Sequence, residues 1–465
     1  MRPTHPFLTA AFVFFTAYTL LYLIQWIASL AISLQRLSSF SARKQQLHRI
    51  FPDSIAEKFP VTVIVPAYNE SACIVETVQT LLQEDYPHLE IIVVDDGSRD
   101  TTAARLIDTF QMKSCPYVYN QTLDTQAIIG HYRQSIGDKQ LVLIRKANGG
   151  KSDALNCGLN FCRTPYCVIV DADTQLQTGA LRIMSSRFAL DDRTTVCAGA
   201  VGTRLHSQDT FHSLRFFQKL LVLFQHIEYY RTFYMQRILF DQINANVIVS
   251  GAFAMFDRDL IVQAGGYRRS TIGEDMELTM RLHAFCLSQN RPYRIAYAPE
   301  ARCDTQVPYH YRDYIRQRRR WHIGMIQSLK QHLYMIGSRS YGLVGTLSVL
   351  YTIVYELLSP LIELCGLVLL LVSAHLHVLN FAFAVRLTLL YILFSLLTQA
   401  VLLTALSVYG VEPLRLRDGL QLLGAALLEV FFFHPLNVLT KLFAFVTYRR
   451  HKADWNHIRR FREKA

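Results

Sequence analysis

A single apolar run near the amino terminus constrains this chain more than any other feature. From Phe7 to Leu34 the sequence carries no charged residue over 28 positions. About 20 apolar residues in a helix cross a bilayer, whereas the apolar core of a cleaved signal peptide is only about 7–15 residues long. We therefore predict a membrane anchor over residues 1–34. Basic residues follow at Arg36, Arg43, Lys44 and Arg49. By the positive-inside rule, that flank is cytosolic.

A second apolar region, residues 341–448, lies near the other end. It contains three stretches, at about 343–375, 381–409 and 419–447. The tail at 449–465 is rich in Lys and Arg, which predicts that it is cytosolic. An even number of crossings must then follow the central segment, so we expect two or four, with other pieces along the membrane interface. Charged residues make up only 18% of the chain, against about 25% in average soluble proteins, which indicates an integral membrane protein.

Residues 35–340, between these regions, have the pattern of a soluble α/β domain. Buried strands are predicted at 61–65, 90–94, 141–144 and 166–170. Helical segments are predicted between them, near 71–84, 98–111 and 152–163. This alternation predicts a doubly wound parallel sheet. Ligands of such sheets bind at the carboxyl ends of the strands, so we expect the chemistry there.

The formal net charge of +12 is compatible with nucleic acid, an anionic membrane or an anionic substrate. The basic residues lie mainly at the edges of apolar segments and in one Arg cluster, and no zinc-finger or RNA-binding signature occurs. We therefore expect no nucleic-acid partner. The nine cysteines form no CxxC pair, which predicts buried thiols rather than a disulfide framework.

Polar residues follow the first two predicted strands. The first leads into Tyr68 and Glu70, and the second into Asp95 and Asp96. Helix capping explains the second group equally well. The functional interpretation is that carboxylates here accept hydrogen bonds from a base N–H and from ribose hydroxyls.

Two later groups carry opposite charges. Gly149 and Gly150 let the backbone approach a ligand, and Lys151 places a positive charge near a helix N-terminus, a position suited to phosphate. The spacing is not that of a P-loop, and an ordinary glycine turn is the alternative. The fourth strand runs into Asp171 and Asp173. Two carboxylates ending an apolar strand predict a Mg²⁺ or Mn²⁺ site, with a capped loop as the alternative.

Ser250 and Gly251 follow another apolar run, and Glu274 and Asp275 precede an amphipathic helix that begins near Met276. Favourable electrostatics at a helix start account for the two acids. A sharper interpretation makes Asp275 the general base for an acceptor hydroxyl.

The run from Gln317 to Trp321 includes Arg318, Arg319 and Arg320 and lies about 20 residues before the second apolar region. A juxtamembrane basic patch on anionic lipid is the plain interpretation, and Arg318 and Arg319 fit it. A guanidinium also clamps diphosphate with two parallel hydrogen bonds. Trp321 offers a flat face for stacking on a sugar ring.

The order of these motifs resembles the processive family 2 glycosyltransferases, namely the cellulose, chitin, hyaluronan and poly-N-acetylglucosamine synthases. The resemblance runs from Val61 to Trp321 and rests most on the DxD, GED and QxxRW groups. It implies a cytosolic GT-A (Rossmann-like) domain and an inverting hexosyltransferase that extends a β-linked polysaccharide, with a UDP-sugar as the first expected donor. It also implies a growing glycan or lipid-linked acceptor, contact with membrane lipid, and accessory synthase or export subunits.

The resemblance assigns a role to each group. The residues assigned to the nucleoside are Tyr68, Glu70, Asp95 and Asp96. Lys151 is assigned to the donor diphosphate, and Asp171 is assigned to binding of the nucleotide sugar. Asp171 and Asp173 are assigned to the metal, Mg²⁺ or Mn²⁺. Asp275 and its neighbour Glu274 are assigned to the catalytic step. The residues assigned to the acceptor and the diphosphate are Gln317, Arg320, Trp321, Ser250 and Gly251.

This chain departs from the family pattern at several points. Gly273 stands where Thr is common, although both acids that follow are in place. Residues 111–140 form a longer insertion than the motif spacing needs. One span precedes the soluble domain where several relatives have two or more, and no cyclic-di-nucleotide-binding domain is expected after the membrane region.

Three other functions remain open at this point. One is a transferase that adds a single sugar to a lipid carrier. Another is a transporter, which the sparse charge in the apolar region disfavours. A third is a catalytically dead scaffold of a synthase complex, which the intact acids at Asp171, Asp173 and Asp275 disfavour.

Overall fold

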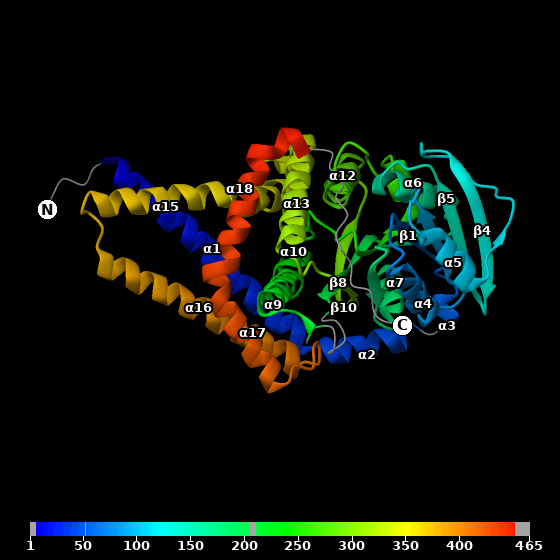
Figure 1. The fold of residues 1–465 in the computed structure, drawn as a ribbon, viewed down its shortest axis with the longest axis horizontal. Coiled ribbons are helices and arrows are strands. Elements are labelled where there is room, and N and C mark those ends of the chain that lie inside the picture. Colours follow the sequence, from blue (N-terminus) through cyan, green and yellow to red (C-terminus); the bar gives the residue numbers. More distant parts are fainter. Residues whose placement is uncertain (1–5, 52, 205–210, 212, 452–465) are drawn as a thin grey trace.

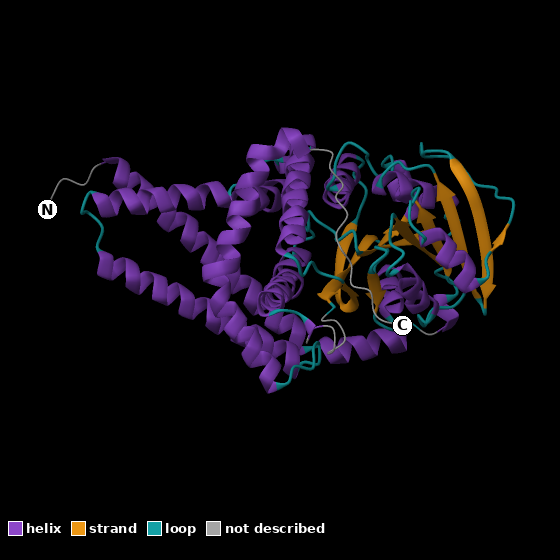
Figure 2. Ribbon diagram, viewed as in Figure 1, coloured by secondary structure: helices purple, strands orange, loops and turns teal. Residues whose placement is uncertain are grey.

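The protein divides into a part built around a sheet and an all-helical part. The computed structural model describes residues 6–51, 53–204, 211 and 213–451. Figure 1 shows the sheet at one end of the molecule and long helices from both ends of the sequence extending away at the other. Figure 2 shows the strands confined to the first part. An α/β domain flanked by long apolar helices confirms the predicted fold class.

The central strands form because their residues are apolar and β-branched, as strands covered on both faces require. All seven residues of β1 are buried. Ten strands make one sheet in the order β3-β4-β5-β2-β1-β6-β9-β8-β10-β7. They are β1 (Val61–Ala67), β2 (Glu90–Asp95), β3 (Lys113–Ser114), β4 (Ile128–Ile136), β5 (Lys139–Lys146), β6 (Tyr166–Val170), β7 (Thr174–Leu176), β8 (Thr194–Thr203), β9 (Phe253–Asp257) and β10 (Arg294–Thr305).

The four strands predicted from the sequence all form and are neighbours. β5, β2, β1 and β6 pair in parallel, with Val63 of β1 opposite Ile91 of β2 and Val168 of β6. The expectation of a wholly parallel sheet is wrong, because β9 runs antiparallel to both β6 and β8. The insertion at 111–140 supplies β3 and β4, which extend one edge of the sheet. β4 turns into β5 through Gly137 and Asp138, and so tight a turn makes those strands antiparallel.

Helices pack on this sheet and continue into the all-helical part. α6 lies close on β1 because Gly158 has no side chain; a Cβ there would stand 2.3 Å from Cγ2 of Ile64. The helices are α1 (Pro6–Ser38), α2 (Phe40–Ile50), α3 (Asp53–Ala56), α4 (Ile74–Leu82), α5 (Thr102–Phe110), α6 (Lys151–Phe161), α7 (Ala180–Leu190), α9 (Phe216–Arg231), η1 (Thr232–Gln236), α10 (Arg237–Gln242), α11 (Arg258–Gln263), α12 (Glu274–Ser288), α13 (Tyr311–Gln331), η2 (Leu333–Met335), η3 (Arg339–Tyr341), η4 (Val344–Ser348), α14 (Val349–Tyr351), η5 (Thr352–Leu357), α15 (Ser359–His375), α16 (Phe381–Val408), α17 (Leu416–Leu428), η6 (Glu429–Phe433) and α18 (His434–His451).

Three helical segments of the described chain are long and apolar enough to cross a membrane: Thr9–Ser38, Phe381–Val408 and Leu416–Arg450. A fourth candidate is the pair Val344–Leu357 and Ser359–His375, which is bent by 50°. These segments confirm the prediction of long apolar helices at both ends. Of the basic tail predicted at 449–465, residues 452–465 lie outside the described residues.

The candidate spans differ in how they relate to the sheet. In Figure 1, α1, α15 and α16 extend away from the sheet, whereas α18 lies beside α13. The turn after α16 returns to the α/β domain, where Arg302 of β10 pairs with Glu412 and the Ser41 hydroxyl donates to the Tyr409 carbonyl. α15 and α16 therefore form a hairpin whose two ends both lie near the α/β domain.

Candidate active site

A cavity of about 780 Å³ runs from the carboxyl ends of β1 and β6 to α18. Its wall contains almost every residue that the sequence singled out, from elements far apart in the chain. These are Tyr68, Glu70, Asp96, Lys151, Asp171, Asp173, Ser250, Gly251, Glu274, Asp275, Gln317, Arg320 and Trp321. Asp95 does not line this cavity; its carboxylate accepts from the Ser98 amide at 3.1 Å and lies 3.8 Å from Nε of Arg145.

Lys151 joins two of the acidic groups. Its Nζ lies 2.7 Å from Oδ1 of Asp171 and 3.2 Å from Oε1 of Glu274. Burial opposes the charge of Lys151, but the two carboxylates outweigh it and raise the pKa of the lysine. Burial also raises the pKa of Glu274, against the stabilising charge of Lys151. The ammonium group thus ties the end of β6 to the first turn of α12.

Asp275 lies beside the loop that carries Ser250 and Gly251. The Gly251 amide donates to Oδ2 of Asp275 at 3.3 Å. A Cβ at Gly251 would stand 3.3 Å from Nζ of Lys151 and 3.4 Å from Cβ of Asp275. Glycine at this position therefore lets the backbone approach both the lysine and the acid.

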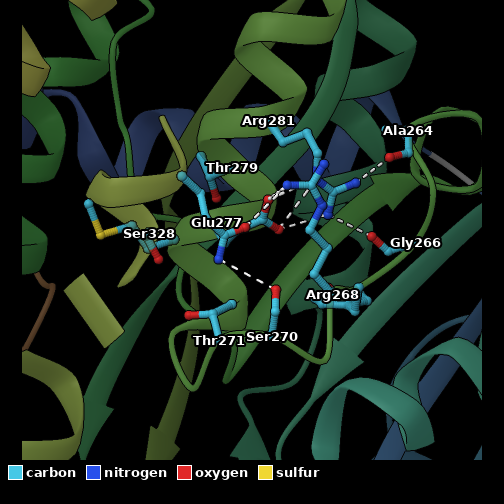
Figure 3. Close-up of polar contacts among 12 residues, drawn as sticks. Ala264, Gly266, Arg268, Ser270, Thr271, Glu277, Thr279, Arg281 and Ser328 are labelled. Carbon is cyan, nitrogen blue, oxygen red and sulfur yellow. Dashed lines mark hydrogen bonds and ion pairs between the residues drawn. The ribbon is translucent and has the colours of Figure 1, made fainter. Parts of the chain in front are cut away.

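The buried carboxylate of Glu277 fixes the first turn of α12 through ion pairs with two arginines. Figure 3 shows Arg268 and Arg281 directed at it. Arg281 donates to it through Nε at 2.9 Å and Nη2 at 2.8 Å, and Nη1 of Arg268 lies 3.3 Å away. Burial opposes the charge, but hydrogen bonds from His332 and Arg281 lower the pKa of Glu277 to about 2. Arg281 also donates to the Gly266 carbonyl at 2.7 Å, so the helix and the preceding loop are fixed together.

The loop before α12 also packs directly on α13. A Cβ added to Gly324 of α13 would lie 2.8 Å from Cα of Gly273, and a Cβ added to Gly273 would lie 2.9 Å from Cα of Gly324. The Ile272 amide donates to Oε1 of Gln327 at 2.9 Å, and Oγ of Ser328 donates to the Gly273 carbonyl at 3.1 Å. Glycine at position 273 thus has a physical reason, because a side chain there would overlap the backbone of α13.

Arg318 does not belong to a lipid-facing patch, so that interpretation is wrong for this residue. Its guanidinium forms two hydrogen bonds to Glu228, at 2.8 and 2.7 Å, and is only 6% exposed. It also lies over the ring of Trp321, 4.3 Å from the centroid. Trp321 itself remains 41% exposed. Arg318 therefore supports the indole, while Arg320 and Trp321 line the cavity.

Lys146, at the end of β5, is a structural residue that sequence reasoning missed. Its side chain is fully buried and its Nζ pairs with both Asp96 and Asp153. Asp96 also accepts from the amides of Gly149 at 3.0 Å and Gly150 at 2.7 Å. Burial raises the pKa of Asp96, and the bond from Lys146 counteracts part of that rise. The sequence signal was a lysine that ends an apolar strand just before the two glycines.

Asp171 and Asp173 are the candidate metal ligands. Within the described residues no group of three or more His, Cys, Asp or Glu side chains has the arrangement of a metal site. Mg²⁺ is commonly held by one or two carboxylates together with substrate phosphates and water. Two carboxylates at the end of β6, lining the cavity, fit that mode of binding.

Comparison with known proteins identifies the family. The profile described as Glycosyltransferase like family 2 matches residues 59–324, more than half of the chain. The chain belongs to this family. This confirms that it is a family 2 glycosyltransferase enzyme, and the matched residues extend from just before β1 to the middle of α13.

This family 2 glycosyltransferase is 28% identical over 273 residues to the hyaluronan synthase of Streptococcus pyogenes, covering 57% of this chain and 56% of that protein. It is 26% identical over 271 residues to the poly-beta-1,6-N-acetyl-D-glucosamine synthase of Staphylococcus aureus (strain COL), covering 58% and 56%. The matched part thus spans about half the length of these curated relatives. Among solved structures, the mannosyltransferase PcManGT from Pyrobaculum calidifontis, in complex with GDP-Man and Mn²⁺, matches with a TM-score of 0.49 and 20% identity over 88% of this chain and 99% of that one.

Replacing Lys146 by Met should destabilise the α/β domain. The substitution keeps the approximate length of the side chain but leaves Asp96 buried without a cation, while Asp153 retains its ion pair with Arg269. Breaking a buried pair in this way costs about 3–5 kcal/mol. Thermal unfolding of the detergent-solubilised protein measures the effect. Lys113→Met, on the exposed β3, is the matched control and should leave the unfolding temperature unchanged. Equal unfolding temperatures for the two variants would contradict a structural role for Lys146.

Proposed function

We propose that this glycosyltransferase is a membrane-embedded processive synthase that extends a β-linked polysaccharide from a nucleoside diphosphate sugar, with a UDP-sugar as the first expected donor. One observation carries the proposal. The cavity that holds the acids and the QxxRW residues continues to the all-helical part, where Tyr22 of α1, Tyr355 of η5 and Lys441 of α18 line it. A growing chain can therefore occupy space that is continuous with the site of sugar addition.

The donor occupies the sheet end of the cavity in this proposal. Tyr68 and Glu70 line this end and would contact the nucleoside, and Asp96 accepts hydrogen bonds from the amides of Gly149 and Gly150. Lys151 and Arg320 supply positive charge to the diphosphate. Asp171 and Asp173 would hold Mg²⁺ or Mn²⁺, which neutralises charge on the departing diphosphate when bound.

Asp275 is the proposed general base. It takes the proton from the acceptor hydroxyl, the oxygen attacks the anomeric carbon, and the bond from that carbon to the diphosphate oxygen breaks. The leaving diphosphate keeps the bonding electrons, and Lys151 and Arg320 stabilise its charge. One displacement inverts the anomeric centre, so an α-linked donor yields a β-linked product.

The same proposal includes a membrane topology. α1 crosses the membrane once. The bent segment that ends in α15 then crosses outward, and α16 crosses back. The Arg302–Glu412 pair supports this, because it returns the end of α16 to the α/β domain. Two crossings then follow that domain, as the basic tail requires, and α17 and α18 stay on the cytosolic side, where α18 packs along α13. In this topology the anchor crosses the membrane, and both the catalytic domain at 35–340 and the tail at 449–465 are cytosolic, as predicted. The cavity would then open toward the membrane region, through which the product would be exported.

Purified protein in nanodiscs, supplied with Mg²⁺ or Mn²⁺ and a panel of nucleotide sugars, should release nucleoside diphosphate with one donor and form a ladder of lengthening product. Release and product size are measured together. A product carrying one added sugar would replace the processive proposal with a transferase acting on a lipid carrier. Absence of release with every donor would contradict the catalytic proposal.

Asp275→Asn should reduce turnover by about 10²–10⁴-fold, because the amide cannot accept the acceptor proton. The dissociation constant of the nucleoside diphosphate, measured by calorimetry, should change by no more than about twofold, since the residues that bind the donor are unchanged. Asp108→Asn, on α5, is the control and should keep wild-type turnover. Turnover by Asp275→Asn near that of the control would exclude Asp275 as the base.

The topology predicts opposite accessibility for two turns. In a Cys365→Ser background, a cysteine placed by Leu379→Cys, between α15 and α16, should react with a membrane-impermeant maleimide applied outside intact cells. A cysteine placed by Arg417→Cys, at the start of α17, should react only after the cells are opened. Equal labelling of both from outside would overturn the proposed hairpin.

A further inference from the structure

The insertion at 111–140 lies against the loop that leads into α12. We call residues 264–273, which connect α11 to α12, the α12 loop. Leu123 of the insertion is buried, and a Cβ added to Gly266 would stand 2.7 Å from its Cδ1. The same Cβ would stand 2.6 Å from Oδ1 of Asn156 on α6. The backbone of the α12 loop therefore lies directly on both the insertion and α6.

The α12 loop is attached to α6 at one residue and to α12 at the next. Nδ2 of Asn156 donates to the Tyr267 carbonyl at 2.9 Å, and its Oδ1 accepts from the Tyr267 amide at 2.7 Å. Arg268 is directed at α12, as Figure 3 shows, and its Nη1 lies 3.3 Å from Oε1 of Glu277. Because these contacts involve consecutive residues, a shift of α6 would displace the first turn of α12.

Arg269, the next residue, bridges α6 and the insertion. Its Nη2 pairs with Oδ2 of Asp153 and donates to the Asp124 carbonyl at 2.6 Å. The side chain of Asp153 is fully buried, whereas that of Arg269 remains 35% exposed. The Asp153 carboxylate also accepts from the Gln126 amide of the insertion at 3.2 Å. Arg269 thus holds the α12 loop to the same carboxylate that binds the backbone of the insertion.

Asp153 also connects Arg269 to the Gly149-Gly150 turn. Its other cation is Lys146, which pairs with Asp96 as well. Asp96 in turn accepts hydrogen bonds from both amides of the Gly149-Gly150 turn. Lys146 alone does not neutralise two buried carboxylates, and an unpaired buried charge is strongly destabilising. Arg269 therefore completes the charge balance of a network that begins at the glycine turn and ends in the α12 loop.

The two ends of this network carry different parts of the proposed reaction. The Gly149-Gly150 turn lies beside the donor diphosphate, and α12 carries Asp275, the proposed base. The reacting atoms must lie about 3–3.5 Å apart, and a displacement of about 1 Å can reduce the rate about 10²-fold. Lys151 joins the two ends in the cavity wall, whereas Arg269 and Asp153 do not line the cavity. Arg269 can therefore affect the reaction only through the position of the α12 loop.

We propose that Arg269 is a positioning residue for the transfer reaction. Its pair with Asp153 sets the position of α12, and thereby of Asp275, relative to the Gly149-Gly150 turn. The insertion contributes by holding the guanidinium through the Asp124 carbonyl. This inference rests on the proposed synthase function. Because Arg269 touches neither donor nor acceptor, its loss should slow the transfer without weakening the binding of the donor.

Steady-state kinetics separate positioning from binding. Arg269→Gln removes the cation at a partly exposed position, so kcat should fall by about tenfold or more while the KM of the donor changes by no more than about twofold. Nucleoside diphosphate release is measured below the unfolding temperature, with the nucleotide sugar on which the wild type is active. Arg269→Lys keeps the charge and should restore most of kcat. Arg193→Gln, which breaks an exposed pair with Asp191, is the matched control and should keep wild-type kinetics.

Hydrogen exchange of the ligand-free protein gives a second readout that needs no turnover. In Arg269→Gln the amides of the α12 loop should exchange about tenfold faster than in the wild type, and Arg193→Gln should leave them unchanged. The inference is overturned if Arg269→Gln keeps the kcat of Arg193→Gln, if it raises the donor KM instead, or if exchange of the α12 loop is unaltered. Absence of release by the wild type would contradict the synthase proposal, whereas the exchange rates would still show whether Arg269 holds the α12 loop.

Discussion

The ion pairs of Lys151 connect the parts of the site that the rest of the structure brings together. Asp171 ends a strand of the parallel core, whereas Glu274 begins a helix more than a hundred residues later. Without a cation between them, the two acids would repel each other in a partly buried space. Lys151 can reach both because it is the first residue of α6, directly after the glycine turn that Asp96 and Lys146 hold in place.

The charge around this lysine has a consequence for the donor. Among the described residues, eight carboxylates line the cavity against five basic side chains, which are Lys151, Arg237, Arg318, Arg320 and Lys441. A nucleoside diphosphate adds more negative charge to a wall that is already acidic. Divalent metal relieves this repulsion, which supports the proposed roles of Asp171 and Asp173. Asp96 needs no such relief, because Lys146 already neutralises it.

Much of the fold and most of the cavity wall could be predicted from the sequence, for a clear physical reason. Parallel strands end at the same edge of a sheet, so polar residues that follow apolar strands converge there even when they are far apart in sequence. Asp95 does not line the cavity because it is still part of β2, where the side chains of adjacent residues point to opposite faces of the sheet. The antiparallel strands could not be read from apolar runs alone, because strand direction depends on the connections, such as the Gly137-Asp138 turn between β4 and β5.

Lys146 could not be found in this way. It matters because of what packs against it, and sequence spacing does not report such contacts. A lysine that ends a strand has the pattern of a solvent-facing residue, but the side chain of Lys146 is buried against Asp96 and Asp153. The contact of Gly273 with Gly324 is likewise decided by the packing of a loop on a distant helix.

That glycine contact also constrains how the sequence can change over evolutionary time. Because each Cα occupies the space that a side chain at the other position would need, neither glycine can be substituted alone without moving α13 relative to α12. The two positions therefore behave as one epistatic unit. A threonine at position 273 becomes acceptable only in a genetic background where the two helices already lie farther apart. Glycine at position 273 is therefore explained by helix packing alone, without reference to the chemistry of the acids that follow it.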